Sequence, residues 1–450
     1  MKTIKIIFVI LILTNLLYSQ EFNFRDVVTG LDTPWEILWG PDGDIWLTER
    51  YGRISKVNPQ TGKLTELITI SQVYEDGERG LMGMVLHPDF QNNPYVYTVF
   101  NYKTDKNETF IKLIRLTYDG EKLKDSLTLI DGIPGAWNHD GSRLIIDNDL
   151  TLYMTIGDAA QPNTAQDLNS KNGKILRLNL DGSIPTDNPY PNSYVWTWGH
   201  RNPQGLIKAN GILYSSEHGP SNDDELNIII KSKNYGWPLV EGFCDKPQEI
   251  QYCQQLNIVE PIAAWTPTLA VAGIDYYNHN LITEWQNSIL MVVLKSSRLV
   301  QLKLSQDYYN VIEENHYFIN QFGRLRDICI SPDGKVFIAT SNKDGRGNPK
   351  PQDDRIIEIT PIATDIRQNK DSGFNIYPNP AKDQIIFETN DYQQKKISIY
   401  NTLGQIITEK TFTGNFFRFD RTKENLTTGI YIIHLKTNNE SITKQIIFID

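Results

Sequence analysis

Cysteine is scarce in this chain of 450 residues, which contains only three. A small scaffold held together by disulfides is therefore excluded. Cys244 and Cys253 lie close together in a stretch that reads as a loop, and an exported protein either oxidises such a pair or leaves it reduced. Cys329 stands in an alternating apolar run, which predicts a buried core position.

Positive charge is outnumbered, since 44 Lys and Arg residues stand against 54 Asp and Glu residues and the formal net charge is -10. Phosphate-rich partners need a basic surface. The charge balance therefore argues against a nucleic acid or an anionic membrane as a general partner, and it favours a neutral substrate.

Long apolar runs are confined to the first residues. Lys2 and Lys5 precede an apolar run over 6–17, and Tyr18-Ser19-Gln20 is typical of a cleavage region. Residues 1–20 are therefore predicted to be a signal peptide. No later segment approaches the roughly 20 apolar residues that a spanning helix needs, so we expect no membrane span.

Amphipathic helical patterns are nearly absent, and short β-rich runs separated by turn residues dominate. One pattern recurs six times: a turn rich in Pro, Asp, Asn or Gly, then an apolar strand that ends in polar residues. The six turns are Pro41-Asp42-Gly43, Pro88-Asp89, Asp147-Asn148-Asp149, Ala209-Asn210-Gly211, Gln286-Asn287 and Pro332-Asp333-Gly334. These repeats predict an all-β protein with a six-bladed β-propeller over residues 21–362. The alternative is a pair of β-sandwiches with coincidental turns.

The repeat also predicts where a site should lie. Equivalent strands of a propeller point their ends at one place, so the polar groups that end the six strands should gather near the axis. These groups are Glu49-Arg50, Asn101, Gly157-Asp158, Glu217-His218, Lys295 and Ser341-Asn342.

A polar stretch over 363–373 reads as a linker, and the strands after it predict a small β-sandwich domain over residues 374–450. With Tyr377-Pro378-Asn379-Pro380, Ile399-Tyr400-Asn401-Thr402-Leu403-Gly404 and Gly429-Ile430-Tyr431, this domain resembles the C-terminal sorting domain of proteins exported by type IX secretion. The resemblance implies the type IX secretion machinery as a partner, and a secreted or cell-surface location reached via the periplasm. A carbohydrate-binding or adhesion sandwich is the alternative.

Two clusters in the propeller offer donors and a base. His139 is a candidate general base near neutral pH, and the alternative is a loop His hydrogen-bonded for structure. Arg201 and Asn202 present a fork of donors beside an amide, which suits a planar, oxygen-rich ligand or charge on a carbonyl oxygen. His200 is either part of that site or a structural partner.

Two further clusters concern a metal and an anion. The main-chain oxygens of Gly219-Pro220, followed by acidic residues, favour a hard cation such as calcium, although the acidic run alone is more typical of a solvated loop. Arg324 and Arg326 have the spacing of one strand face, and Lys295 ends another strand. These cations imply an anionic ligand near the axis, with surface salt bridges as the alternative.

Seven strings of residues in the propeller resemble, in sequence and in their order along the chain, the soluble glucose dehydrogenase and aldose sugar dehydrogenase family, which uses pyrroloquinoline quinone. The likeness covers about residues 24–360. The strings are Gly77-Glu78-Arg79-Gly80-Leu81-Met82-Gly83, His87-Pro88-Asp89-Phe90, Thr155-Ile156-Gly157-Asp158, Gly199-His200-Arg201-Asn202-Pro203-Gln204-Gly205, Glu217-His218-Gly219-Pro220, Asp223-Asp224-Glu225 and Asn234-Tyr235-Gly236-Trp237-Pro238.

The resemblance implies a role for each matching residue. His139 would take the proton from the anomeric hydroxyl of the sugar, and Asp158 would steady the region of His139 or Arg201. Arg201, with Asn202 beside it, would polarise the quinone carbonyl that receives the hydride. The other implied roles are a calcium held by the main-chain oxygens of Gly219 and Pro220, cofactor pairing by Lys295, Arg324 and Arg326, sugar contact by Glu78 and Trp265, and a second, structural calcium at Asp224 and Glu225.

The expected function is the oxidation of aldoses to lactones, with calcium and an external electron acceptor. The sequence departs from the glucose enzyme at Glu78, where that enzyme has Gln, and at His218, which is similar to the aldose branch. The natural sugar therefore stays open. The alternatives are a non-catalytic ligand- or protein-binding propeller of the same family, like the hedgehog-interacting-protein relatives, and a calcium-dependent lactonase, which needs side-chain ligands around an axial calcium.

Overall fold

The computed structural model describes residues 21–362, 374–389, 393–402, 404–436 and 441–450. The signal peptide predicted over 1–20 and the linker predicted over 363–373 lie outside the described residues. The chain divides into two compact units, Met1–Pro361 and Ile362–Asp450.

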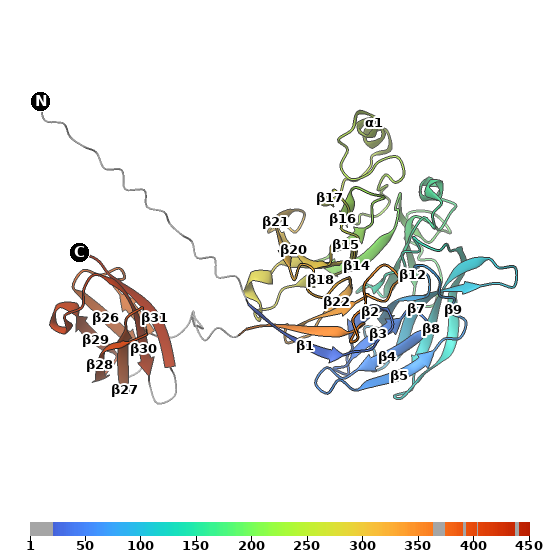
Figure 1. Cartoon of the computed structure of the whole chain (residues 1–450). Helices are drawn as coiled ribbons and strands as arrows, with labels where there is room; N and C mark the ends of the chain where they lie inside the picture. Colours follow the sequence, from blue (N-terminus) through green and yellow to red (C-terminus); the bar gives the residue numbers. More distant parts are fainter. Residues whose placement is uncertain (1–20, 363–373, 390–392, 403, 437–440) are drawn as a thin grey trace, which may run out of the picture. The chain divides into compact units, whose positions relative to one another are not determined.

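The first unit contains six four-stranded antiparallel sheets (Figure 1). The first is β2 (Pro34–Trp39), β3 (Ile45–Glu49), β4 (Arg53–Val57) and β5 (Leu64–Thr69), and the second is β6 (Leu81–Leu86), β7 (Tyr95–Lys103), β8 (Thr109–Tyr118) and β9 (Leu123–Pro134). The third is β10 (Leu144–Ile146), β11 (Thr151–Ile156), β12 (Lys174–Asn179) and β13 (Val195–Trp198), and the fourth is β14 (Pro203–Ala209), β15 (Ile212–Glu217), β16 (Asp224–Ile228) and β17 (Ala263–Trp265). The fifth is β18 (Val271–Tyr277), β19 (Ser288–Val293), β20 (Arg298–Leu304) and β21 (Val311–Tyr317).

The sixth sheet is closed by the N-terminal strand of the unit. Its order is β1 (Phe22–Val28), β24 (Ile356–Pro361), β23 (Val336–Thr340) and β22 (Leu325–Ile330). The first strands of the sheets contact one another in a closed cycle, β2–β6–β10–β14–β18–β22–β2. The predicted six-bladed propeller is therefore confirmed, with these six strands around the axis.

Buried charges join the blades near the axis. The Arg143 guanidinium contacts Glu36 of β2 at 2.5 Å and Asp327 of β22 at 3.0 Å. Burial raises the pKa of Glu36 well above its usual range, and the charge of Asp327 adds to the effect. Gly273 of β18 allows the close approach, because a Cβ there would lie 2.0 Å from Asp327 Oδ1. Four of the six blades thus meet at one polar cluster.

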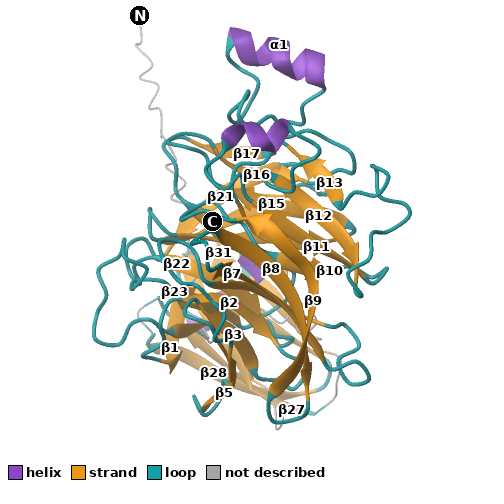
Figure 2. Ribbon diagram, turned by 90° about the vertical axis from the view of Figure 1, so that its right-hand side faces the viewer, coloured by secondary structure: helices purple, strands orange, loops and turns teal. Residues whose placement is uncertain are grey.

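Helices are few among the described residues. Figure 2 shows α1 (Pro247–Leu256) projecting from the strands, and three short 3-10 turns span Pro162–Gln166, Thr283–Trp285 and Arg421–Glu424. None of these helices has the length and apolar character that crossing a membrane requires. The stretch around Cys253 is a helix rather than the predicted loop, since Pro247 starts it and Asn257 ends it in a left-handed conformation.

Two of the three cysteines form a disulfide, and the third is free. Cys244 and Cys253 form a disulfide with a Cα–Cα distance of 6.4 Å, which fastens α1 to the loop before it. Cys329 is free and buried among apolar side chains, so its predicted core position is confirmed.

The second unit is a small β-sandwich with a core of its own. One sheet is β25 (Phe374–Tyr377), β26 (Gln384–Thr389) and β29 (Phe416–Asp420). The other is β28 (Ile406–Thr413), β27 (Gln394–Tyr400), β30 (Gly429–Lys436) and β31 (Ser441–Phe448). Buried residues of this core come only from 374–448.

Candidate active site

One face of the propeller gathers most of the predicted residues. The loops that enter β10, β14 and β22 carry His139, Arg201 and Arg324, and the loops that follow β11 and β15 carry Asp158 and His218. Chain direction alternates along each antiparallel sheet, so these loops all lie at the same ends of the strands.

His139 is held by its ring and by its backbone. Nδ1 lies 2.9 Å from Oδ1 of the buried Asp158, while the ring stays partly exposed. The backbone of His139 is left-handed, with φ of 62°. Its N–H donates to Glu78 Oε2 at 3.4 Å, and its carbonyl accepts from Ala159 N–H at 3.1 Å. With Nδ1 turned to the carboxylate, Nε2 is the nitrogen left to exchange a proton.

Arg201 is fixed next to this pair. Its carbonyl accepts from Asp158 N–H at 2.8 Å, and its own N–H donates to Glu217. The guanidinium donates to Gly219 O at 2.9 Å and lies 5.3 Å from the ring centre of Trp237. Burial lowers the pKa of Arg201, although the charges of Asp158 and Glu217 oppose this shift.

The side-chain amides of Asn202 and Gln204 link the fourth blade to the sixth. Asn202 Oδ1 accepts from Gly141 N–H at 3.1 Å and from Gln204 Nε2 at 3.0 Å. Gln204 Oε1 in turn accepts from Arg326 Nη1 at 3.0 Å. Burial lowers the pKa of Arg326 to about 10. Residues from the third, fourth and sixth blades are therefore joined in one network.

Three buried donors in this network find no hydrogen-bond partner within the described residues: Arg201 Nε, Asn202 Nδ2 and Arg326 Nε. An unmade hydrogen bond at a buried donor costs about 1–3 kcal/mol. Such donors fit a bound group that presents several carbonyl or carboxylate oxygens.

His200 is a structural residue. It is fully buried, its Nδ1 lies 2.9 Å from Glu217 Oε2, and its Nε2 lies 2.9 Å from Thr197 Oγ1. Its ring also stacks on Tyr235 at 4.6 Å. Of the two interpretations that the sequence left open for His200, the structural one holds.

The acidic residues that begin β16 accept hydrogen bonds from the protein itself. Asp224 accepts from Gly219 N–H at 2.9 Å and from Ala270 N–H at 2.6 Å, so both of its oxygens are engaged. Glu225 accepts from Gly242 N–H at 2.9 Å and from Asn227 at 2.8 Å. Burial and the neighbouring Glu217 raise the pKa of Glu225 to about 8.

A metal site made of side chains is not formed in the described part of the chain, where no three His, Cys, Asp or Glu residues are arranged to hold an ion. The predicted calcium ligands are main-chain oxygens instead, and Gly219 O already accepts from Arg201. His218 beside it is unsuited to carry charge, because burial and the nearby Arg326 and Arg201 lower its pKa to about 3.

The other predicted cations differ in their surroundings. Arg324 Nε donates to Asp344 Oδ2 at 2.8 Å, and Arg326 lies 3.9 Å from the same oxygen, so both side chains face one carboxylate of the protein. Lys295 is exposed and donates to Thr268 Oγ1 at 3.1 Å. Its ammonium is therefore free to turn toward another partner.

Trp265 does not join the group. It belongs to β17, the outermost strand of the fourth sheet, and its indole N–H donates to Glu314 of β21 at 3.1 Å. Its ring packs in the core between the fourth and fifth sheets. This position does not favour the predicted contact with a sugar.

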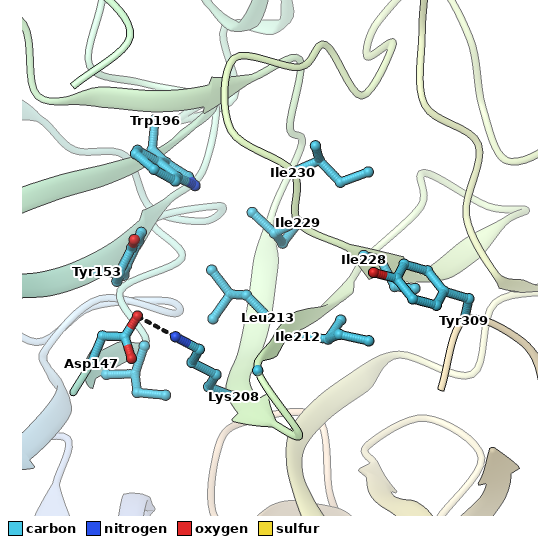
Figure 3. Close-up of a pocket in the computed structure, with 12 residues that line it drawn as sticks. Asp147, Tyr153, Trp196, Lys208, Ile212, Leu213, Ile228, Ile229, Ile230 and Tyr309 are labelled. Carbon is cyan, nitrogen blue, oxygen red and sulfur yellow. Dashed lines mark hydrogen bonds and ion pairs between the residues drawn. The ribbon is translucent and has the colours of Figure 1, made fainter. Parts of the chain in front are cut away.

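A separate pocket of about 340 Å³ lies at the opposite ends of the strands (Figure 3). It is lined by aliphatic residues such as Ile212 and Ile229, by the ring of Trp196, and by the ion pair of Asp147 with Lys208 at 2.5 Å. None of the predicted site residues lines it.

Known proteins match both units. Residues 31–349 match the family model "Glucose / Sorbosone dehydrogenase". The chain belongs to the glucose/sorbosone dehydrogenase family. The match covers well over half of the chain, so the family expected from the sequence strings is confirmed.

Relatives of this glucose/sorbosone dehydrogenase family member include sugar dehydrogenases. Quinoprotein glucose dehydrogenase B of Acinetobacter calcoaceticus is 34% identical over 73% of this chain and 87% of its own length. Aldose sugar dehydrogenase YliI of Escherichia coli is 31% identical, over 70% of this chain and 89% of its own. The structure of the PQQ-bound aldose sugar dehydrogenase of Streptomyces coelicolor matches with a TM-score of 0.66 and 33% identity, covering 76% of this chain and 99% of the other.

The second unit matches a sorting module. Residues 375–449 match the family model "Secretion system C-terminal sorting domain". The predicted type IX sorting domain is confirmed, which indicates export to the cell surface or the medium.

Sequence reasoning assigned no role to several residues of the site in this glucose/sorbosone dehydrogenase family member. Trp237 Nε1 donates to Asp158 Oδ2 at 2.8 Å, so it holds the carboxylate oxygen that His139 does not contact. Gln204 connects the fourth blade to Arg326 of the sixth, and Asp344 joins Arg324 and Arg326 within the sixth blade. Trp237 and Gln204 stand inside quoted strings, which was the only available signal for them.

Proposed function

We propose that this protein is a secreted quinoprotein dehydrogenase that oxidises the anomeric hydroxyl of aldose sugars to lactones. Its cofactors would be pyrroloquinoline quinone and calcium, and its electrons would pass to an external acceptor. The observation that carries the proposal is the His139–Asp158 pair beside three buried donors that lack partners. Residues 1–20 would act as the signal peptide, and the type IX machinery would complete export from the periplasm.

The donor set supports the quinone as the ligand. Arg201, Asn202 and Arg326 would donate to its oxygens, while Lys295 and Arg324 would add positive charge around its carboxylates. The main-chain oxygens of Gly219 and Pro220 would hold calcium, once the Arg201 guanidinium turns from Gly219 O toward the ligand.

When bound, the quinone supplies a carbonyl carbon that accepts a hydride, and calcium makes that carbonyl more electrophilic. The chain's own residues move the proton. His139 Nε2 accepts it from the sugar hydroxyl, and Asp158 keeps Nδ1 protonated and stabilises the cationic ring that results. Trp237 and Ala160 N–H, at 2.8 and 2.9 Å, hold Asp158 in place for this task.

The protein without cofactors, supplied with calcium and the quinone, should reduce a redox dye when aldoses are added. The Asp158→Asn variant should keep most of its quinone affinity but lose about 10²- to 10⁴-fold in kcat, because the amide no longer stabilises the charged imidazole. The surface variant Asp105→Asn is the matched control and should behave like the wild type.

Three results would count against this function. Absence of quinone-dependent dye reduction across a broad aldose panel would overturn the proposal. Quinone binding seen by calorimetry without turnover would indicate a binding propeller instead. Hydrolysis of lactones without any quinone would indicate a lactonase.

A further inference from the structure

Trp137 is the exposed aromatic residue closest in sequence to the proposed base. It lies two residues before His139 in the loop between β9 and β10, and 55% of its surface is exposed. A single exposed aromatic residue is ordinary in proteins and by itself indicates nothing. Its anchoring and its neighbours are what distinguish it.

The backbone that carries Trp137 is tightly fixed. Its carbonyl accepts from Glu78 N–H at 2.8 Å. Gly77, with φ of +64°, permits this approach, because a Cβ there would lie 2.5 Å from the Trp137 carbonyl oxygen and 3.4 Å from ring atom Cε3. Asp140 Oδ1 holds the same loop by accepting from Ala136 N–H at 2.9 Å. The indole thus packs over Gly77 from a rigid base while much of its surface remains open.

Glu78, next to Gly77 in the chain, belongs to a charged pair. Glu78 Oε1 lies 3.1 Å from Arg346 Nη2, and these side chains are 26% and 55% exposed. Arg346 comes from the loop between β23 and β24, and Asp344 fixes that loop by accepting from Arg346 N–H at 2.9 Å. Glu78 also touches His139 N–H. An exposed ring in the same loop as the proposed base and a charged pair that contacts this residue through Glu78 are therefore supplied by different loops.

We propose that Trp137, Glu78 and Arg346 form a subsite for the second ring of an oligosaccharide whose reducing-end ring is oxidised at His139. The inference rests on the proposed function. A sugar ring has an apolar C–H face, which packs on an aromatic surface, and hydroxyls, which bond to carboxylate and guanidinium groups. Because the backbone under Trp137 is already ordered, little conformational entropy would be lost on binding.

The test compares a disaccharide with a monosaccharide in the full-length holoenzyme. Trp137→Ala should lower kcat/KM for cellobiose or maltose about tenfold and change kcat/KM for glucose less than about twofold, as expected for the loss of one good aromatic contact. Trp137→Phe should retain most of the disaccharide activity, and it guards against a fold defect in the alanine variant. Tyr309→Ala is the matched control, since Tyr309 is 53% exposed and lines the pocket at the opposite strand ends.

A second readout does not need turnover. Titration of the cofactor-free protein with cellobiose should change tryptophan fluorescence, and Trp137→Phe should abolish the change. If the wild type oxidises no sugar but shows this Trp137-dependent binding, the proposed function fails and Trp137 stands as a sugar-binding residue only. If the ratio of disaccharide to monosaccharide kcat/KM is the same in wild type and Trp137→Ala, the subsite is overturned. In an inactive protein, binding that is independent of Trp137 also overturns it.

Discussion

Asp140 follows His139 in the chain. Its side chain is buried, whereas that of His139 is partly exposed. Its carboxyl accepts from Asn101 Nδ2 at 2.8 Å and from Ala136 N–H at 2.9 Å. Burial raises the pKa of Asp140 from 3.8 to about 7, because two neutral donors do not offset the loss of water. The folded protein therefore keeps a proton there that the unfolded chain releases near pH 4.

This raised pKa predicts a pH dependence of stability. Between about pH 4 and pH 7 the folded state binds more protons at Asp140, so its contribution to stability falls as the pH rises and is constant above that window. Asp140→Asn has no charge to bury. The unfolding free energy of the variant minus that of the wild type should therefore rise by on the order of 2–4 kcal/mol from pH 4.5 to pH 8. Denaturant unfolding at both pH values checks this.

Asp105→Asn, an exposed change of the same chemical kind, provides the comparison. Its difference from wild type should stay constant across the same pH range. An Asp140→Asn difference that is equally constant would show that Asp140 titrates like an exposed carboxyl.

Residues whose type and local pattern indicate chemistry were predictable from the sequence, and the partners that the fold brings to them were not. His139, Arg201 and Arg326 were named from the sequence, and the structure joins them through Asp158, Asn202 and Gln204. Asp344, which pairs with Arg324, lies in a polar loop without a distinctive pattern. Its partner is twenty residues away in the sequence, and only the fold brings the two together.

Among the elements, β1 shows how the ring is closed. The sequence predicted six repeats but not that the last blade borrows its fourth strand from the start of the chain. That pairing leaves no local signal, since β1 and β24 are separated by almost the whole propeller. Phe22 of β1 also packs against the fifth blade. The centre of its ring lies 4.9 Å from that of the buried Trp285 and 5.3 Å from that of Phe318.

Phe22→Ala should therefore destabilise the propeller at the place where the first and last parts of the chain close it. We expect a loss of about 1–3 kcal/mol in unfolding free energy, since Phe22 is only partly buried, and a melting midpoint lower by roughly 2–5 °C in calorimetry. Arg25→Ala on the same strand removes a surface ion pair with Glu358 and a hydrogen bond to Pro59 O at 2.7 Å, but no apolar packing, and should cost about 1 kcal/mol or less. Equal effects of the two substitutions would argue that β1 does not hold the propeller closed.

At the scale of the whole molecule, the two units keep separate hydrophobic cores. Propeller clusters draw their buried residues from 27–359, whereas the core of the second unit comes from 374–448. The proposed active-site residues lie entirely in the first unit, and the sorting-domain match lies entirely in the second. Folding and chemistry of the propeller should then be independent of the export signal.

Removal of residues 363–450 tests this independence. The shortened protein, made with its first 20 residues for export from the cytoplasm, should melt at the same midpoint as the propeller transition of the full chain, because no residue of the propeller core is lost. Its quinone-dependent sugar oxidation should be within about twofold of the full-length value, and it should accumulate in the periplasm instead of reaching the medium. Calorimetry, dye reduction and cell fractionation measure the three quantities. A propeller that melts at a lower temperature without the second unit would show that the sorting domain also stabilises the enzyme.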